Sequence, residues 1–307
     1  MFDLASEAPA SVAPRIARWP QEPASVPIRA PHLRLVTEER RLPDVLSHRD
    51  PAFARQLYPS IARLVDTYYR AEVEGEEHLT DQASMVVSTH NGGLAMPELW
   101  CMIMTFWRRF GIETPAYGLM HKAAFSVPLL GQTLTRLGAI PANQDNGTIA
   151  LREGFPLLVC PGGDEDTLKP YRKRHTIVFG RRKGFIKLAI RQQVPIIPVV
   201  SVGAHETMLV LNEGRRTARI LGLEKYFRIK VVPITLSFPF GITPAGLFAI
   251  PVPSKVRLRV LPPIDLAEPV WAADREDRVH RCFNHVCHTM QRALDDLASR
   301  RRLPVLG

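Results

Sequence analysis

The chain has 307 residues, of which 46% are hydrophobic and 23% are charged, a composition typical of a folded globular protein rather than a disordered one. Its 40 Lys and Arg against 30 Asp and Glu give a net charge of +10, which favours polyanionic partners such as nucleic acid, an anionic membrane or a phosphorylated substrate. The four cysteines form no Cys-x-x-Cys pair and no zinc-ligand spacing with histidine, so neither a disulfide framework nor a zinc site is indicated, and a reducing cytoplasmic compartment fits best.

The first 45 residues are predicted to be a disordered, proline-rich tail. Pro9, Pro14, Pro20, Pro23 and Pro27 interrupt a stretch that has no continuous apolar segment, so it does not have the pattern of a secretory signal. Residues 46–307 are assigned to a single domain, a length that one α/β core can support.

The predicted elements begin with an amphipathic helix over 51–74, in which apolar side chains recur at three-and-four spacing with Arg55, Arg63 and Arg70 between them. Packing against the core is the simpler role for this helix, and lying on a membrane is the alternative. Strands are predicted at 85–89, 116–120, 139–140, 157–160 and 195–201. Helices are predicted after Pro97 and over 128–137, 147–153 and 182–193.

This alternation predicts an α/β fold, with a mainly parallel mixed sheet flanked by helices on both faces. Late strands over 228–236 and 255–260 are expected to be antiparallel at an edge, and apolar positions from Val279 to Leu297 predict a long C-terminal helix. The uncharged run 231–253 is long enough to span a membrane, but its five prolines would break a helix. A buried strand followed by an apolar loop is therefore expected there.

The carboxyl ends of the strands are the first places to look for chemistry, since ligands gather there in an open α/β sheet. His90 ends one strand, Gly92 and Gly93 follow it, and Glu98 falls in the first turn of the next helix. A carboxylate bonded to one imidazole nitrogen leaves the other free to take a proton from a hydroxyl. Alternatively, His90 only packs and Glu98 only favours a helix N-terminus, and the spacing alone does not decide.

Four blocks in chain order favour the catalytic interpretation. They are Thr-His-Asn-Gly-Gly-Leu-Ala-Met-Pro-Glu at 89–98, a looser match over 125–142, Val-Cys-Pro-Gly-Gly-Asp-Glu-Asp at 159–166 and Val-Pro-Ile-Ile-Pro-Val at 194–199. Together they resemble the PlsC-like glycerolipid acyltransferase superfamily, and more closely its bacterial branch related to monoacylglycerol and diacylglycerol acyltransferases. The resemblance runs from about 73 to 211, nearly half of the chain.

The sequence departs from this superfamily in two ways. Most members have an aspartate five residues after the histidine, whereas here residue 95 is alanine and the acid is Glu98. Members with a phosphorylated acceptor have Glu-Gly-Thr in the third block and an arginine in the second, where this chain has Gly162-Gly163-Asp164 and Ala142-Asn143. The resemblance therefore favours a neutral acceptor.

The resemblance implies transfer of a fatty acyl group from acyl-CoA, or from an acyl carrier protein, to a hydroxyl of a lysophospholipid, monoacylglycerol or diacylglycerol. His90 would be the general base and Glu98 its orienting acid, with acyl-CoA as co-substrate and no bound cofactor. Residues expected to bind the oxyanion, donor or acceptor are Asn91, Gly92, Gly93, Pro161, Gly162, Gly163, Lys122, Arg172, Lys173, Arg181, Arg182 and Lys183. The basic ones would meet CoA phosphates or an anionic bilayer, although a solvated surface explains such a charge run equally well.

The sequence also bears on several other classes of protein. A non-catalytic lipid- or acyl-CoA-binding protein on the same scaffold is the main alternative, because Glu98 replaces the expected aspartate. No Gly-x-Ser-x-Gly elbow indicates a serine hydrolase, no nucleic-acid-binding motif is recognisable, and the acids at 164–166 lack further metal-ligand partners. A lipid acceptor, the basic charge and the apolar run 231–253 predict peripheral association with the inner face of the cell membrane.

Overall fold

The computed structural model describes residues 42–127, 129–212, 214, 233–237, 239–244, 250–303 and 305 of the chain. The chain divides into two units, residues 1–41 and 42–307, and all described residues belong to the second. The predicted tail therefore lies outside the described residues as far as 41. Helix α1 (Asp44–Ser47) already begins within the last residues assigned to that tail.

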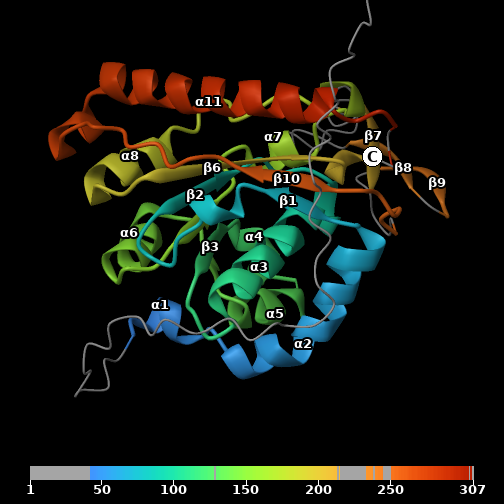
Figure 1. Cartoon of the computed structure of the whole chain (residues 1–307), viewed down its shortest axis with the longest axis horizontal. Helices are drawn as coiled ribbons and strands as arrows, with labels where there is room; N and C mark the ends of the chain where they lie inside the picture. Colours follow the sequence, from blue (N-terminus) through green and yellow to red (C-terminus); the bar gives the residue numbers. More distant parts are fainter. Residues whose placement is uncertain are drawn as a thin grey trace, which may run out of the picture. The chain divides into compact units, whose positions relative to one another are not determined.

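Seven strands form one mixed sheet in the order β1-β10-β6-β2-β5-β3-β4 (Figure 1). They are β1 (Glu72–Glu74), β2 (Met85–Ser88), β3 (Tyr117–Met120), β4 (Ala139–Pro141), β5 (Leu157–Val159), β6 (Ile196–Val202) and β10 (Arg257–Val260). Neighbours from β6 to β4 are parallel, while β10 pairs antiparallel with β6 and parallel with β1. The predicted mainly parallel mixed sheet flanked by helices is confirmed.

The central strands are buried on both faces because their alternate side chains enter two cores. On β2, Met85 and Val87 belong to the core that contains α8 and α11, whereas Val86 belongs to the core of α2 and α3. Figure 1 shows these two helix pairs on opposite sides of the sheet. The helices are α2 (Pro51–Arg63), α3 (Pro97–Phe110), α4 (Lys122–Phe125), α5 (Leu130–Arg136), α6 (Gln144–Arg152), α7 (Gly163–Thr167), α8 (Gly184–Gln192) and α11 (Glu276–Ser299).

The helix predicted over 51–74 ends earlier than expected. It consists of α2 and a π-helical turn, η1 (Leu64–Tyr68), after which the chain forms the edge strand β1. Glu72 of β1 pairs with Arg257 of β10, and their side chains form an ion pair with an N–O distance of 2.9 Å. Because the partner lies 185 positions away, local periodicity could not reveal this strand.

The two late strands are not both where the sequence suggested. Strand β10 is not at the edge of the main sheet, since β1 covers it. Strand β8 (Ile234–Ser237) belongs to a second, antiparallel sheet with β7 (Leu209–Asn212) and β9 (Gly241–Pro244). Residues 228–232 and 245–249 lie outside the described part, but β9 occupies part of the predicted apolar loop. None of the described helices combines the length and apolarity needed to cross a bilayer.

Candidate active site

His90 and Glu98 lie side by side at the carboxyl end of β2. Nδ1 of His90 is 2.7 Å from Oε1 of Glu98, which projects from the first turn of α3. The Glu98 side chain is fully buried, whereas the His90 side chain is 15% exposed. Since an ionised carboxylate can only accept hydrogen bonds, Nδ1 carries the proton and the lone pair of neutral His90 is on Nε2.

The turn between the two residues depends on left-handed backbone conformations. Gly92 has a φ of 74°, and a Cβ there would lie 2.7 Å from the carbonyl oxygen of Ala204. Gly93 has a φ of 61°, and a Cβ there would overlap the side chain of Met208. Only glycine fits both positions. Met96 is also left-handed, with a φ of 46°, and this strained residue directly precedes α3 and returns Glu98 to the histidine.

The backbone of the motif is held by two carboxylates. The N–H of Asn91 donates to Oε1 of Glu98 at 2.9 Å, and the N–H of His90 donates to Oδ2 of Asp166 at 2.7 Å. The side-chain amide of Asn91 also donates, from Nδ2, to Oγ of Ser201 on β6 at 2.9 Å. The motif is therefore fixed from α3, from β6 and from the third sequence block.

The third block, residues 159–166, packs closely against the first. Gly162 is buried, and a Cβ there would lie 2.2 Å from Cβ of Asp166. The Arg182 guanidinium donates to the carbonyl oxygen of Gly162 and braces the turn. Asp166 belongs to this block but was not among the expected site residues, although its position shortly after the glycine pair was a signal for such a role.

The electrostatic surroundings of His90 favour its protonated form. Burial lowers the pKa of His90, but the hydrogen bond and charge of Glu98, together with Asp166, outweigh it and raise the pKa above its ordinary value of 6.5. Burial, with Glu98 and Asp166 nearby, raises the pKa of the Cys160 thiol well above its usual range. A neutral thiol is a poor nucleophile, so Cys160 is not suited to form an acyl intermediate.

The predicted basic residues have different surroundings. Lys122, Arg172, Lys173 and Arg181 are exposed. Lys183 forms an ion pair with Glu276 at the start of α11, with an N–O distance of 2.6 Å, and Arg182 braces Gly162. Lys183 and Arg182 therefore have structural partners within the protein.

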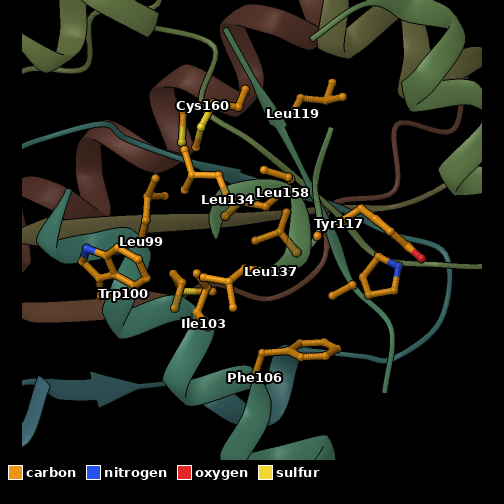
Figure 2. A pocket seen from close by; sticks show the side chains of 18 of the residues that line it. Leu99, Trp100, Ile103, Phe106, Tyr117, Leu119, Leu134, Leu137, Leu158 and Cys160 are labelled. Atoms are coloured by element: carbon orange, nitrogen blue, oxygen red, sulfur yellow. The ribbon is translucent and has the colours of Figure 1, made fainter. Parts of the chain in front are cut away.

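An apolar cavity of about 130 Å³ lies beside the motif. Figure 2 shows Leu99 and Ile103 of α3 on its wall, with Leu134 of α5 and Leu158 of β5. Cys160, which is followed by Pro161 and the glycine pair of the third block, also lines the cavity. The cavity thus reaches the carboxyl end of β5. Among the described residues, no group of three His, Cys, Asp or Glu side chains could hold a metal ion.

Comparison with known proteins gives consistent matches. A family model described as diacylglycerol acyltransferase matches residues 49–253. An uncharacterised protein of Mycobacterium tuberculosis is 29% identical over 261 residues, which cover 82% of this chain and 69% of the relative. The enzyme of Gallus gallus described as a DGAT1/2-independent enzyme synthesizing storage lipids is 27% identical over 168 residues, 55% of this chain and 48% of its own length.

Two further matches extend this picture. Diacylglycerol O-acyltransferase 2 of Xenopus laevis is 30% identical over 95 residues, 29% of this chain and 26% of that protein. The crystal structure of the 1-acyl-sn-glycerophosphate acyltransferase PlsC from Thermotoga maritima is similar with a TM-score of 0.50 and 16% identity, covering 83% of this chain and 86% of that one. At this identity, the structural likeness shows the fold alone.

Proposed function

The chain belongs to the diacylglycerol acyltransferase family, and from this we propose that it transfers a fatty acyl group from acyl-CoA to a hydroxyl of a glycerolipid, with His90 as general base. The protein is an O-acyltransferase of lipid metabolism. This assignment excludes the main alternative, a non-catalytic lipid- or acyl-CoA-binding protein. What we propose beyond this is the identity of the acyl donor, of the acceptor and of the general base. A monoacylglycerol or diacylglycerol acceptor is preferred to a lysophospholipid, because the third block has Gly162-Gly163-Asp164 and not Glu-Gly-Thr.

The buried hydrogen bond between Glu98 and Nδ1 of His90 carries this proposal. Nε2 of neutral His90 takes the proton of the acceptor hydroxyl as its oxygen attacks the thioester carbonyl. The tetrahedral intermediate then expels the CoA thiolate, which receives the proton back from the imidazolium. Glu98 accepts the Nδ1–H hydrogen bond throughout and stabilises the imidazolium between these steps. The acyl group goes directly to the acceptor, with no covalent enzyme intermediate.

The contacts narrow the choice of oxyanion donors. The N–H of Asn91 already donates to Glu98, the N–H of Gly163 donates to the carbonyl of Cys160 at 3.3 Å, and Pro161 has no N–H. Gly92, Gly93 and Gly162 remain as candidates. Gly92 and Gly93 are favoured because they open the 3₁₀-helix η3 (Gly93–Ala95), whose first N–H groups have no acceptors within the helix.

The apolar cavity supports a fatty acyl substrate. Its walls come from hydrocarbon and aromatic side chains, and each methylene buried there gains about 0.8 kcal/mol. Because Cys160 and Met96 line the cavity close to the motif, a chain bound in it would present its carbonyl end near His90. This arrangement suits a fatty acyl thioester.

A peripheral position on the inner face of the cell membrane completes the proposal. On the β8–β9 hairpin, Leu236 lies opposite Ile242, and these side chains are 47% and 69% exposed. Phe240 at the turn is 61% exposed. Grouped apolar side chains of this kind suit contact with a bilayer, and a net charge of +10 suits its anionic lipids.

Incubation with labelled acyl-CoA and a panel of monoacylglycerol, diacylglycerol and lysophospholipids tests the reaction. We expect acylation of a neutral acceptor and release of one free thiol for each acyl group transferred. A parallel arm with acyl carrier protein as donor tests the choice of CoA. Binding of acyl-CoA without transfer to any acceptor would contradict the proposal.

A further inference from the structure

A buried ion pair contacts the backbone of His90. Oδ2 of Asp166 accepts a hydrogen bond from the backbone N–H of His90 at 2.7 Å. Oδ1 of Asp166 accepts one from Nζ of Lys169, also at 2.7 Å. The Asp166 and Lys169 side chains are 0% and 1% exposed. Burying two charges is costly, and apolar replacements of such pairs are often neutral or stabilising. Stability alone therefore does not explain the pair.

The surrounding chain is shaped to hold this pair. Gly162 has no Cβ, which allows Asp166 to approach the turn, and Nζ of Lys169 also donates to the carbonyl oxygen of Thr176 at 2.9 Å. The segment from 162 to 176 thus closes around the two charges. It delivers one carboxylate oxygen to His90 and one to Lys169.

The hydrogen bond from the backbone N–H of His90 to Asp166 fixes the position of the His90 main chain, and so of the Cα from which the imidazole side chain extends. Glu98 orients the imidazole ring through Nδ1 and holds the next N–H, that of Asn91. Asp166 holds the N–H of His90 itself. Together they determine where Nε2 lies, and a displacement of about 1 Å at a reacting group can cost roughly 100-fold in rate.

Lys169 offsets one of the two carboxylate charges around His90. Glu98 from α3 and Asp166 from α7 are the carboxylates that act on His90, Lys169 is the cation, and His205 and the Cys160 thiol also lie in its surroundings. Asp166 raises the pKa of His90 and Lys169 lowers it. Burial lowers the pKa of His205 well below its usual range, so this second imidazole adds no charge.

We propose that Asp166 and Lys169 are a positioning pair for His90: Asp166 anchors the histidine backbone, and Lys169 cancels the charge that this carboxylate brings. Neither side chain needs to touch the substrate. The inference rests on the proposed role of His90 as general base.

Titration of the His90 imidazole by NMR tests the charge balance without any substrate, with the resonance identified by its loss in His90→Gln. In Lys169→Met, the pKa of His90 is expected to rise by about one unit, and in Asp166→Asn to fall by a similar amount. The double variant Asp166→Asn/Lys169→Met should titrate near the wild type. Exposed Glu165→Gln is the matched control. A His90 pKa that is unchanged in both folded single variants overturns the charge balance.

Two double variants test whether the hydrogen bond from the His90 N–H to Asp166 anchors the histidine. Both also replace Lys169, so neither leaves an unpaired buried charge. Asp166→Asn/Lys169→Met keeps an oxygen for the His90 N–H, and kcat should stay within about tenfold of wild type. Asp166→Ala/Lys169→Met removes that oxygen, and kcat should fall about 100-fold while KM changes little. Equal kcat values in the two folded double variants overturn the anchor. Wild-type transfer by His90→Ala would instead overturn the proposed function.

Discussion

Oε1 of Glu98 lies 2.7 Å from Nδ1 of His90 and 2.9 Å from the backbone N of Asn91. One buried oxygen thus orients the ring and fixes the chain beside it. The acid comes from the first turn of α3 and not from the loop, and the left-handed Met96 with Pro97 at the helix start brings it back. A spacing of eight residues therefore brings the acid into hydrogen-bonding contact with the histidine.

Glu98→Gln is expected to lower kcat by at least about 100-fold, because the amide neither fixes the Nδ1–H tautomer as well nor stabilises the imidazolium. The change is nearly isosteric, so the fold should remain. Initial rates of thiol release measure the loss. Glu165→Gln, at an exposed acid of the third block, should keep wild-type activity. Equal rates for Glu98→Gln and the wild type would show that Glu98 has no part in the reaction.

The pH dependence of kcat/KM follows from the His90 pKa. Although burial lowers this pKa, Glu98 and Asp166 raise it above 6.5, and a protonated Nε2 cannot accept the hydroxyl proton. Activity should therefore fall on the acid side with an apparent pKa above 6.5, and this limb should move to lower pH in Glu98→Gln, where burial dominates. This assignment would be contradicted if the apparent pKa of the acid-side fall in wild-type kcat/KM were below 6.5, or if Glu98→Gln left that pKa unchanged.

The same raised pKa predicts how stability depends on pH. A group with a raised folded pKa stabilises the fold fully below its unfolded value, near 6.5, and loses this contribution as the pH rises through the folded pKa. The free energy of unfolding of the wild type relative to Glu98→Gln should therefore decrease as the pH rises from about 6.5 through the folded pKa of His90. Urea titrations at several pH values measure it, and the opposite slope would exclude the ion pair.

Gly92→Ala tests the turn. Gly92 and Gly241 share a φ of 74°, but a Cβ at 92 would crowd the Ala204 carbonyl, whereas nothing lies within 4 Å of a Cβ at 241. Gly92→Ala should therefore destabilise the fold by about 1–3 kcal/mol more than Gly241→Ala. It should also lower kcat, because the turn sets the distance between His90 and Glu98. Denaturant unfolding and initial rates measure both effects, and equal losses in the two variants would mean that crowding is unimportant.

Much of the fold was predictable because it is local. The apolar runs of β2 and β6 and the periodicity of α11 indicate buried strands and a one-sided helix without any knowledge of their partners. The edge strand β1 was missed because its three residues are stabilised by pairing with β10, far along the chain. The second sheet was missed for a similar reason, since its strands are short and depend on one another.

In the candidate site, too, local features could be predicted from the sequence, whereas contacts between distant residues could not. His90 and Glu98 are close in sequence, so spacing and the glycine pair were enough to suggest that they meet. Asp166 reaches the histidine from 76 residues away, and its partner Lys169 resembles a surface lysine in sequence although it is fully buried. The basic run suggested phosphate binding, but a sequence cannot reveal that Lys183 is paired with Glu276.

The double variant Phe240→Ser/Ile242→Ser tests the membrane surface. Loss of two exposed apolar side chains should weaken binding to anionic vesicles at least tenfold, since burying each one in lipid contributes roughly 1.5–3 kcal/mol. Co-sedimentation with phosphatidylglycerol-containing vesicles at low salt measures it. Val270→Ser/Trp271→Ser removes similarly exposed side chains elsewhere and should bind as the wild type does. No binding by the wild type, or equal loss in both variants, would refute this surface.

The kcat of His90→Ala in transfer from acyl-CoA to a neutral glycerolipid tests the central claim most directly, with exposed His285→Ala as the control. General-base catalysis by His90 predicts a fall of roughly 100- to 10,000-fold with the fold intact, while the control retains wild-type activity. A folded His90→Ala protein that transfers the acyl group at the wild-type rate would contradict the account.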